Sequence, residues 1–333
     1  MRKSLLFFCF VVSLLNSSCN RNPLDVDVSG IKIEPVKIGR FEKDLFQKPL
    51  NIAMLRSKYG DFFKGFTETI LCPNGMSDPG CTGGIQSFVN DQDVQNCFSD
   101  CEKAFPDMND FEAQVNDVFR HYRYHFPSRS LPQVNTMMTF FNYSMLRLDK
   151  TIGIGLEMYL GPNCNYYNRL QYPVYKTANM GKAHVLPDFV RAWMLTEFEE
   201  KNPLPDFLTR IVDEGKIAYL TDALLPKMDD TLKMGFSLRQ LNWCKANEAH
   251  IWSFFLKRRL LYSTDSQIIT QFTNEGPFTT GFSKESPART GSWVGWQIVR
   301  AFMAKNSNIS LQQLMEMKDA QKILVASGYK PKL

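Results

Sequence analysis

The first 19 residues of the chain, MRKSLLFFCFVVSLLNSSC, have the layout of an export signal that ends in a cysteine. Arg2 and Lys3 form a positive start, and an apolar stretch follows that only Ser13 interrupts. A stretch of about 11 apolar residues is too short to span a bilayer as a mature helix. Small polar residues before Cys19 suit a lipoprotein signal peptidase, although Asn16 stands where leucine is usual. A plain secretory signal with an incidental cysteine is the alternative.

The signal divides the chain into three parts. We expect a lipoprotein signal peptide at 1–18, a tether at 19–30 and a single domain at 31–333, because no linker-like segment interrupts the sequence after residue 30. Acyl chains on Cys19 would anchor the protein, since each buried methylene contributes about 0.8 kcal/mol. The residues after Cys19 include no immediate acidic run, which favours the periplasmic side of the membrane.

Six cysteines remain after Cys9 is removed with the signal and Cys19 is acylated. An exported chain with an even number of cysteines favours disulfides. The candidates are Cys72, Cys81, Cys97 and Cys101, which allow three pairings. Cys97 and Cys101 share one face of an expected helix, which suits two bonds to the preceding loop better than a bond between them. A four-thiolate zinc site is the alternative, but the Cys72 and Cys81 spacing is too wide for it. Cys164 and Cys244 are left to pair or to remain buried thiols.

Composition and periodicity predict an α+β fold. The chain is 44% hydrophobic and 22% charged, and its formal charge of +5 falls to +3 without the signal's Arg2 and Lys3. The basic residues are scattered, so we expect no nucleic-acid partner. Alternation predicts a strand at 31–36 and strands within 133–160, whereas 52–71, 111–126 and most of the chain after 187 have helical spacing. This indicates a small sheet packed by many helices, with a helix-rich C-terminal half.

Local signals place several helix starts and contacts. Ser237 with Gln240 and Ser310 with Gln313 each form a capping box. Pro187 is expected to open one helix. A later helix starts near Thr290 and carries Gly291 and Gly295 one turn apart, so another helix could approach it closely.

Motifs for catalysis are missing. His121 and His125 have the spacing of a zinc pair, but Tyr122 stands where the general-base glutamate should follow the first histidine. The sequence contains no G-x-S-x-G, P-loop or dinucleotide fingerprint. We therefore assign no catalytic residue and expect neither a cofactor nor a metal.

Six stretches of the sequence together resemble the gliding-motility lipoprotein GldB family of Bacteroidetes. They are FRHYRYHFP (119–127), IGIGLEMYLG (152–161), PDFVRAWMLTEF (187–198), NEAHIW (247–252), LLYSTD (260–265) and SPARTGSWVGWQIVRAFM (286–303). The similarity runs from about residue 31 to 330. The resemblance implies an outer-membrane, periplasmic-side lipoprotein connected with gliding motility and its secretion machinery. It implies no particular biochemical activity, and relatives also occur in species that do not glide.

The family is also distantly similar to zinc-peptidase-like domains with an H-E-x-x-H helix and a later E-G helix. The resemblance puts Pro187, Asp188 and Arg191 in the place of the first motif and Glu214 in the second. Proline has no donor side chain and arginine stays protonated, so neither replaces a histidine ligand. We therefore expect a degenerate zincin-like core. Gly215 after Glu214 has a simpler interpretation, in which it lets two helices pack closely.

The C-terminal helix offers candidate binding residues. Arg289, Trp293, Trp296 and Arg300 are types enriched at interaction hot spots, and a groove is expected between them and the helix that carries Glu248. The alternative is that the tryptophans complete the core and that Arg289 caps the helix or pairs with Glu285.

These observations favour a non-catalytic envelope lipoprotein, held to the membrane by its N-terminal lipid, that binds a periplasmic protein or glycan. One alternative is a periplasmic metallopeptidase that uses His121, His125 and a distant carboxylate. A purely structural scaffold in the gliding or secretion apparatus is the third possibility.

Overall fold

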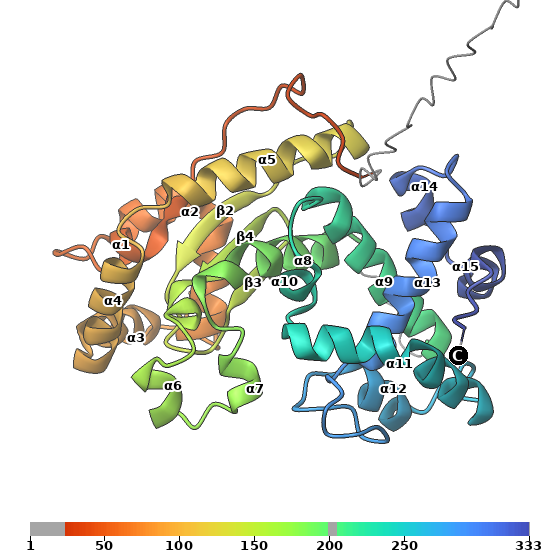
Figure 1. Ribbon diagram of the computed structural model, residues 1–333. Coiled ribbons are helices and arrows are strands. Elements are labelled where there is room, and N and C mark those ends of the chain that lie inside the picture. Colours follow the sequence, from red (N-terminus) through yellow and green to blue (C-terminus); the bar gives the residue numbers. More distant parts are fainter. Residues whose placement is uncertain (1–23, 199–204, 333) are drawn as a thin grey trace, which may run out of the picture.

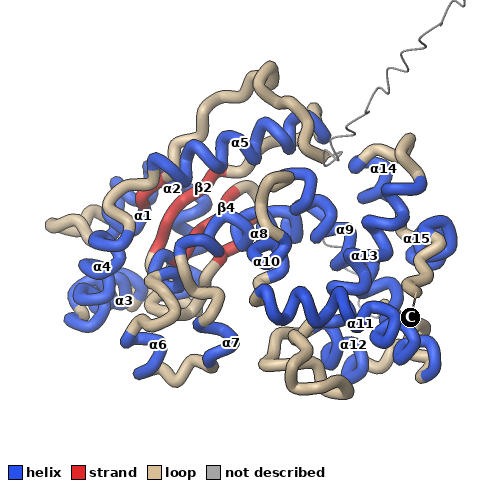
Figure 2. Tube along the Cα trace, viewed as in Figure 1, coloured by secondary structure: helices blue, strands red, loops and turns tan. Residues whose placement is uncertain are grey.

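The computed structural model describes residues 24–198 and 205–332. The export signal and Cys19 lie outside these residues, so both remain predictions. The described part is an α+β fold, as predicted, in which a small sheet is surrounded by helices (Figures 1 and 2). The strands are β1 (Gly39–Arg40), β2 (Gln133–Met137), β3 (Met145–Leu148) and β4 (Thr151–Gly155). The helices are α1 (Phe41–Leu45), α2 (Ile52–Phe66), α3 (Cys81–Asn90), α4 (Gln92–Ala104), α5 (Asn109–His125), α6 (Asn165–Arg169), α7 (Val174–Thr177), α8 (Val185–Phe198), α9 (Phe207–Leu224), α10 (Asp230–Met234), α11 (Leu238–Lys257), α12 (Ser266–Thr273), α13 (Thr290–Lys305), α14 (Leu311–Glu316) and α15 (Ala320–Ser327). Shorter turns are η1 (Thr67–Leu71), η2 (Leu156–Tyr159) and η3 (Lys182–His184).

The sheet has the order β1-β2-β4-β3, and its edge strand β3 runs antiparallel to β4. All residues of β4 are buried, because helices cover both faces. On one face Phe62 of α2 lies so close to Gly153 that a Cβ there would be 2.8 Å from its ring. On the other face Ile152 and Ile154 join the main core with residues of α5 and α8. The strands expected in 133–160 are confirmed up to Gly155, after which the chain turns into η2.

The prediction of a strand at 31–36 was wrong. This segment is not part of the sheet, and β1 begins only at Gly39. The backbone N–H groups of Val36 and Ile38 donate to the side chains of Asn116 and Glu112, both on α5. The polarity of segment 31–36 therefore alternates because one side of the segment packs on α5 and the other side faces solvent.

The C-terminal half is organised around the pair α9 and α13. Gly215 of α9 and Gly295 of α13 lie at their closest contact, where a Cβ on Gly295 would be 1.7 Å from the carbonyl oxygen of Ile211. This confirms the expected close approach of another helix to Gly295. Both predicted capping boxes, at Ser237 and Ser310, are present. The helix expected to open at Pro187 instead begins at Val185, with Pro187 still in its first turn.

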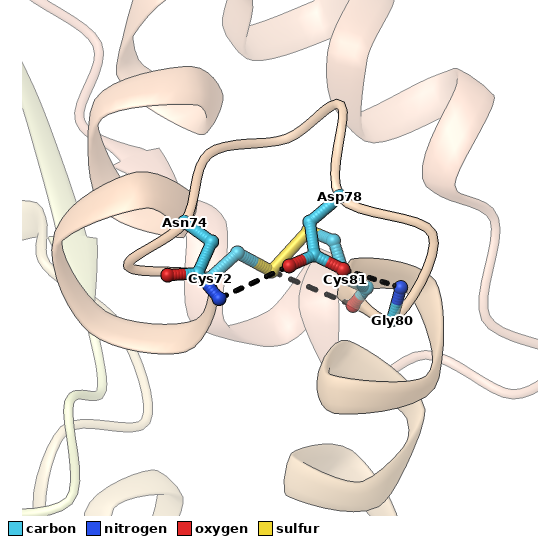
Figure 3. The surroundings of a disulfide bond; sticks show 5 residues. All are labelled: Cys72, Asn74, Asp78, Gly80 and Cys81. Atoms are coloured by element: carbon cyan, nitrogen blue, oxygen red, sulfur yellow. Dashed lines mark hydrogen bonds between the residues drawn. A yellow bond between two sulfur atoms is a disulfide. The ribbon is translucent and has the colours of Figure 1, made fainter.

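The cysteine pairing differs from the expected one. Cys72 is bonded to Cys81, so the disulfide closes the loop between η1 and α3 (Figure 3). Within this loop Asp78 accepts hydrogen bonds from Asn74 and the Gly80 N–H (Figure 3). Cys97 and Cys101 are free thiols, because their face of α4 points into the core rather than toward the loop. Cys244 is a buried free thiol, whereas Cys164 is free and partly exposed.

Among the described residues, no helix is both long enough and apolar enough to cross a bilayer.

Candidate functional site

A cleft of about 670 Å³ lies between the sheet and the C-terminal helices. Its walls come from the loop and strand at 142–145, the segment 172–180, the α10–α11 junction and the loop 275–289. Figure 1 shows where α7, α10 and α11, which contribute residues to these walls, lie in the fold. The cleft combines tyrosine rings, side-chain amides and charged groups, which is a surface suited to binding.

Asp188 of α8 lies at the cleft, partly exposed to it. The hydroxyl of Tyr159 donates to its carboxylate at 2.9 Å. Desolvation raises the pKa of Asp188 to about 6, against the opposing effects of the Tyr159 hydrogen bond and the charges of Arg191 and Arg289. Burial therefore has a larger effect on the pKa of this carboxyl group than the hydrogen bond and the two guanidinium groups together.

Arg289 is the cationic counterpart of Asp188 in the cleft wall. Its backbone adopts a left-handed conformation, with φ of 57°, which is costly for a residue other than glycine. Its guanidinium donates to the Met234 carbonyl and lies 5.4 Å from the centroid of the Phe236 ring. Burial lowers the pKa of Arg289, and the charge of Arg191 adds to that effect. Glu285, the partner considered for Arg289, instead pairs with Arg239.

A strained loop brings Tyr143 to the cleft. Phe140 and Phe141 both have positive φ, and a buried carboxylate holds them in place. Glu157 accepts hydrogen bonds from the Thr139 N–H and hydroxyl, both at 2.7 Å, and from the Phe141 N–H at 3.2 Å. Desolvation raises the pKa of this fully buried carboxyl group. Glu157 was not among the predicted site residues, although a lone glutamate inside the apolar run IGIGLEMYLG was the available signal.

The positions matched to the zinc-peptidase motifs are partly brought together. The charges of Asp188, Arg191 and Glu214 all act on Arg289, so the three lie in one neighbourhood. One oxygen of Glu214 pairs with Arg210 at 2.8 Å, and the other is buried without a partner. Pro187 is buried and contributes no donor atom. In the described ranges, no three histidine, cysteine, aspartate or glutamate side chains are grouped as a metal site would need.

The two histidines of the alternative hypothesis lie on α5 and are not among the residues that line the cleft. Desolvation lowers the pKa of His121, and it lowers that of His125 to about 4. Both imidazoles are therefore neutral near pH 7. His121 lies 3.9 Å from Asp117, which is an electrostatic contact within the same helix.

Some of the C-terminal residues predicted to bind a partner lie in the core, and others line a groove. Trp293 and Trp296 are almost fully buried, as the alternative interpretation held. Arg300 and Glu248 line a second, shallower groove of about 580 Å³ between α11, α13 and the C-terminal segment. Both already have partners there, because Arg300 binds Asp222 and Asp230 and Glu248 accepts from Tyr329. Binding by these residues remains a prediction.

Comparison with known families decides the relationship of the chain. The model of the family described as gliding motility protein GldB matches residues 21–331. The chain belongs to the GldB family. Membership makes it a gliding-motility-associated lipoprotein of the cell envelope. No curated protein and no solved structure matches it.

Asp188 gives this GldB-family protein a testable pH dependence. A carboxyl group whose folded-state pKa is raised stabilises the fold below its unfolded pKa, and that stability is lost as pH rises through the folded value. The window here runs from about 4 to about 6, with Arg191, Arg289, Glu275 and Tyr159 facing the carboxyl group. We expect Asp188→Asn to be about 1–2 kcal/mol more stable than the wild type at pH 7 and to gain nothing at pH 4.

Urea unfolding at several pH values between 4 and 7 would measure this difference. Asp61→Asn, at an exposed position of α2, is the matched control and should follow the wild type throughout. An Asp188→Asn advantage of equal size at both ends of the pH range would contradict the assignment.

Proposed function

We propose that this GldB-family lipoprotein is a non-catalytic component of the envelope, anchored through Cys19 to the periplasmic side of the outer membrane, that binds a partner protein in its cleft. The partner would belong to the gliding or associated secretion machinery. The observation that carries the proposal is the cleft itself. Its lining includes Asp188, one of the positions that the resemblance to zinc peptidases singled out, together with aromatic and cationic side chains that suit contact with a partner.

The side chains of the cleft support binding to a protein. Tyr143 and Leu238 line it with 41% and 66% of their surface exposed, so both side chains are accessible to a partner. Tyr159, Asp188 and Arg289 add a hydroxyl and two opposite charges deeper inside. Aromatic, arginine and aliphatic groups in one concave surface are typical of the centre of a protein interface.

The donor set supports the non-catalytic part of the proposal. The place of the first motif holds Pro187 and Arg191, and the nearest carboxylates are engaged with Tyr159 and Arg210. A zinc hydrolase needs three protein ligands and an activated water. The described residues around Asp188 do not offer such a set.

Site-specific crosslinking in cells that make the protein tests the proposal. A photoreactive residue at Leu238, in the cleft, is expected to give one discrete protein adduct. The same residue at Val325 on α15 is the matched control, because 69% of Val325 is exposed and it does not line the cleft. Adding Tyr143→Ala to the Leu238 variant should lower the adduct yield at least several-fold.

Two results would oppose the proposal. One is an absence of any adduct specific to Leu238. The other is zinc-dependent hydrolysis by the purified protein that Asp188→Asn abolishes. Protease-resistant adducts that a glycan-cleaving enzyme removes would instead identify a glycan partner.

A further inference from the structure

The N-terminal segment of the described chain is fixed to the domain from its first residues. Leu24 packs against the main core, and Val28 is only 6% exposed. Asp25 lies 3.7 Å from Lys227, and farther along Val36 donates to Asn116 at 2.9 Å. Residues 24–30, which we expected to be tether, therefore lie against the domain.

This attachment leaves a very short connection to the lipid. Only residues 20–23 separate Cys19 from Leu24, and five peptide steps span at most about 18 Å. A compact domain of this size has a radius of gyration of roughly 19 Å, which corresponds to a diameter of roughly 50 Å. The connection is thus much shorter than the domain is wide, so the far side of the domain cannot reach the membrane that holds the acyl chains.

The structure shows which side lies near the lipid. The described chain starts beside the C-terminal end of α5, at the top of Figure 1. The helices α6, α7 and α11 lie at the opposite side of the same view (Figure 1). Because α7 and the start of α11 contribute residues to the cleft lining, that part of the lining is on the side away from the lipid attachment (Figure 1).

The C-terminal part of α5 and Lys227, which lies 3.7 Å from Asp25, carry side chains that suit a lipid headgroup region. We call this region the membrane-proximal surface and define it by Arg120, Arg123, Tyr124 and Lys227. Tyr124 is 48% exposed, and Lys227 is also exposed. Aromatic and basic side chains of this kind are favoured at the membrane interface, because an apolar body and a polar tip can both be accommodated there. Asp117 and Asp25 offset part of the positive charge, so the short connection contributes more to orientation than electrostatic attraction does.

We propose that the membrane-proximal surface rests on the lipid headgroups and that the cleft opens away from the membrane, toward the periplasm. Residues that reach a partner would then project from the side of the molecule opposite the anchor. The inference depends on acylation of Cys19 and not on which partner occupies the cleft.

Quenching by a lipid-attached nitroxide tests the orientation. The acylated full-length protein would be placed in vesicles of phosphatidylethanolamine and phosphatidylglycerol that contain a headgroup-labelled nitroxide lipid. A fluorophore would be attached at Tyr124→Cys or at Leu238→Cys, each with Cys164→Ser to remove the partly exposed native thiol. We expect at least twofold stronger quenching at position 124 than at position 238.

Equal quenching at the two positions, or stronger quenching at 238, would overturn the proposal. Cys19→Ala is the control for the anchor and should abolish quenching at both positions. The measurement needs no partner protein. Its failure would therefore leave the crosslinking test of the cleft unaffected, and the reverse also holds.

Discussion

Gly295→Ala is expected to destabilise the protein by about 3 kcal/mol or more, which is a large part of the stability of a typical domain. A Cβ at this position would lie 1.7 Å from the carbonyl oxygen of Ile211 and 2.5 Å from the carbonyl carbon of the same residue. These are backbone atoms of α9, so no side-chain rotation can relieve the overlap. The helices α9 and α13 would have to move apart, and the packing between Gly215 and Gly295 would be lost.

Thermal or urea unfolding followed by circular dichroism would measure this effect. The matched control is Gly83→Ala in α3, where a new Cβ meets nothing within 4 Å. That substitution should stabilise the protein by up to about 1 kcal/mol, since alanine is the better helix former. If the free energy of unfolding of Gly295→Ala lies within about 0.5 kcal/mol of the wild-type value, the two helices are not as close as described.

Asp222→Ala is expected to cost about 3 kcal/mol, because it removes a buried carboxylate that pairs with Arg300 and Lys233 and leaves Asp230 as their remaining acidic partner. Asp222 is 2% exposed and accepts hydrogen bonds from Trp296 at 2.8 Å and from Arg300 at 2.8 and 2.9 Å. Lys233, whose side chain is only 5% exposed, donates to it at 3.0 Å. Without Asp222, the indole N–H of Trp296 loses its acceptor and the two cations lose part of the negative charge that offsets their desolvation.

The exposed pair of Arg239 and Glu285 provides the comparison. Their side chains are 77% and 60% exposed, so Glu285→Ala should change the free energy of unfolding by less than about 1 kcal/mol. Similar urea midpoints for Asp222→Ala and Glu285→Ala would show that the buried network contributes little. The network also explains Trp296 and Arg300, whose sequence context indicated a binding surface. In the folded protein both bind Asp222.

Periodicity and capping signals predicted the elements that depend on local interactions. The helices at 52–66, 109–125 and 207–224 and the caps at Ser237 and Ser310 follow from neighbouring residues along the chain. The segment 31–36 shows the limit of this reasoning. Its alternating pattern fits a strand, but its hydrogen bonds go to side chains of α5, which is about 75–80 residues away in sequence.

The candidate site was only partly predictable. Asp188 and Arg289 were singled out, the first by resemblance to a motif and the second by its residue type. Tyr143, Tyr159 and Glu157 were missed, because each acts through the strained loop at Phe140 and Phe141 or through α8. A backbone conformation with positive φ at two phenylalanines cannot be inferred from residue types that normally avoid it.

The sequence by itself determined the export signal pattern, the family, the α+β class and the capped helix starts at Ser237 and Ser310, since these depend on residues that are close along the chain or on similarity over most of its length. Only the tertiary structure decided the Cys72–Cys81 pairing, the burial of Trp293 and Trp296, and the meeting of Asp188 with Arg289 at one cleft. The physical reason is that burial and pKa depend on the surroundings of a side chain in space. Asp188 and Arg289 are 101 positions apart in sequence, and packing of α8 and the start of α13 around one cleft gives each its environment.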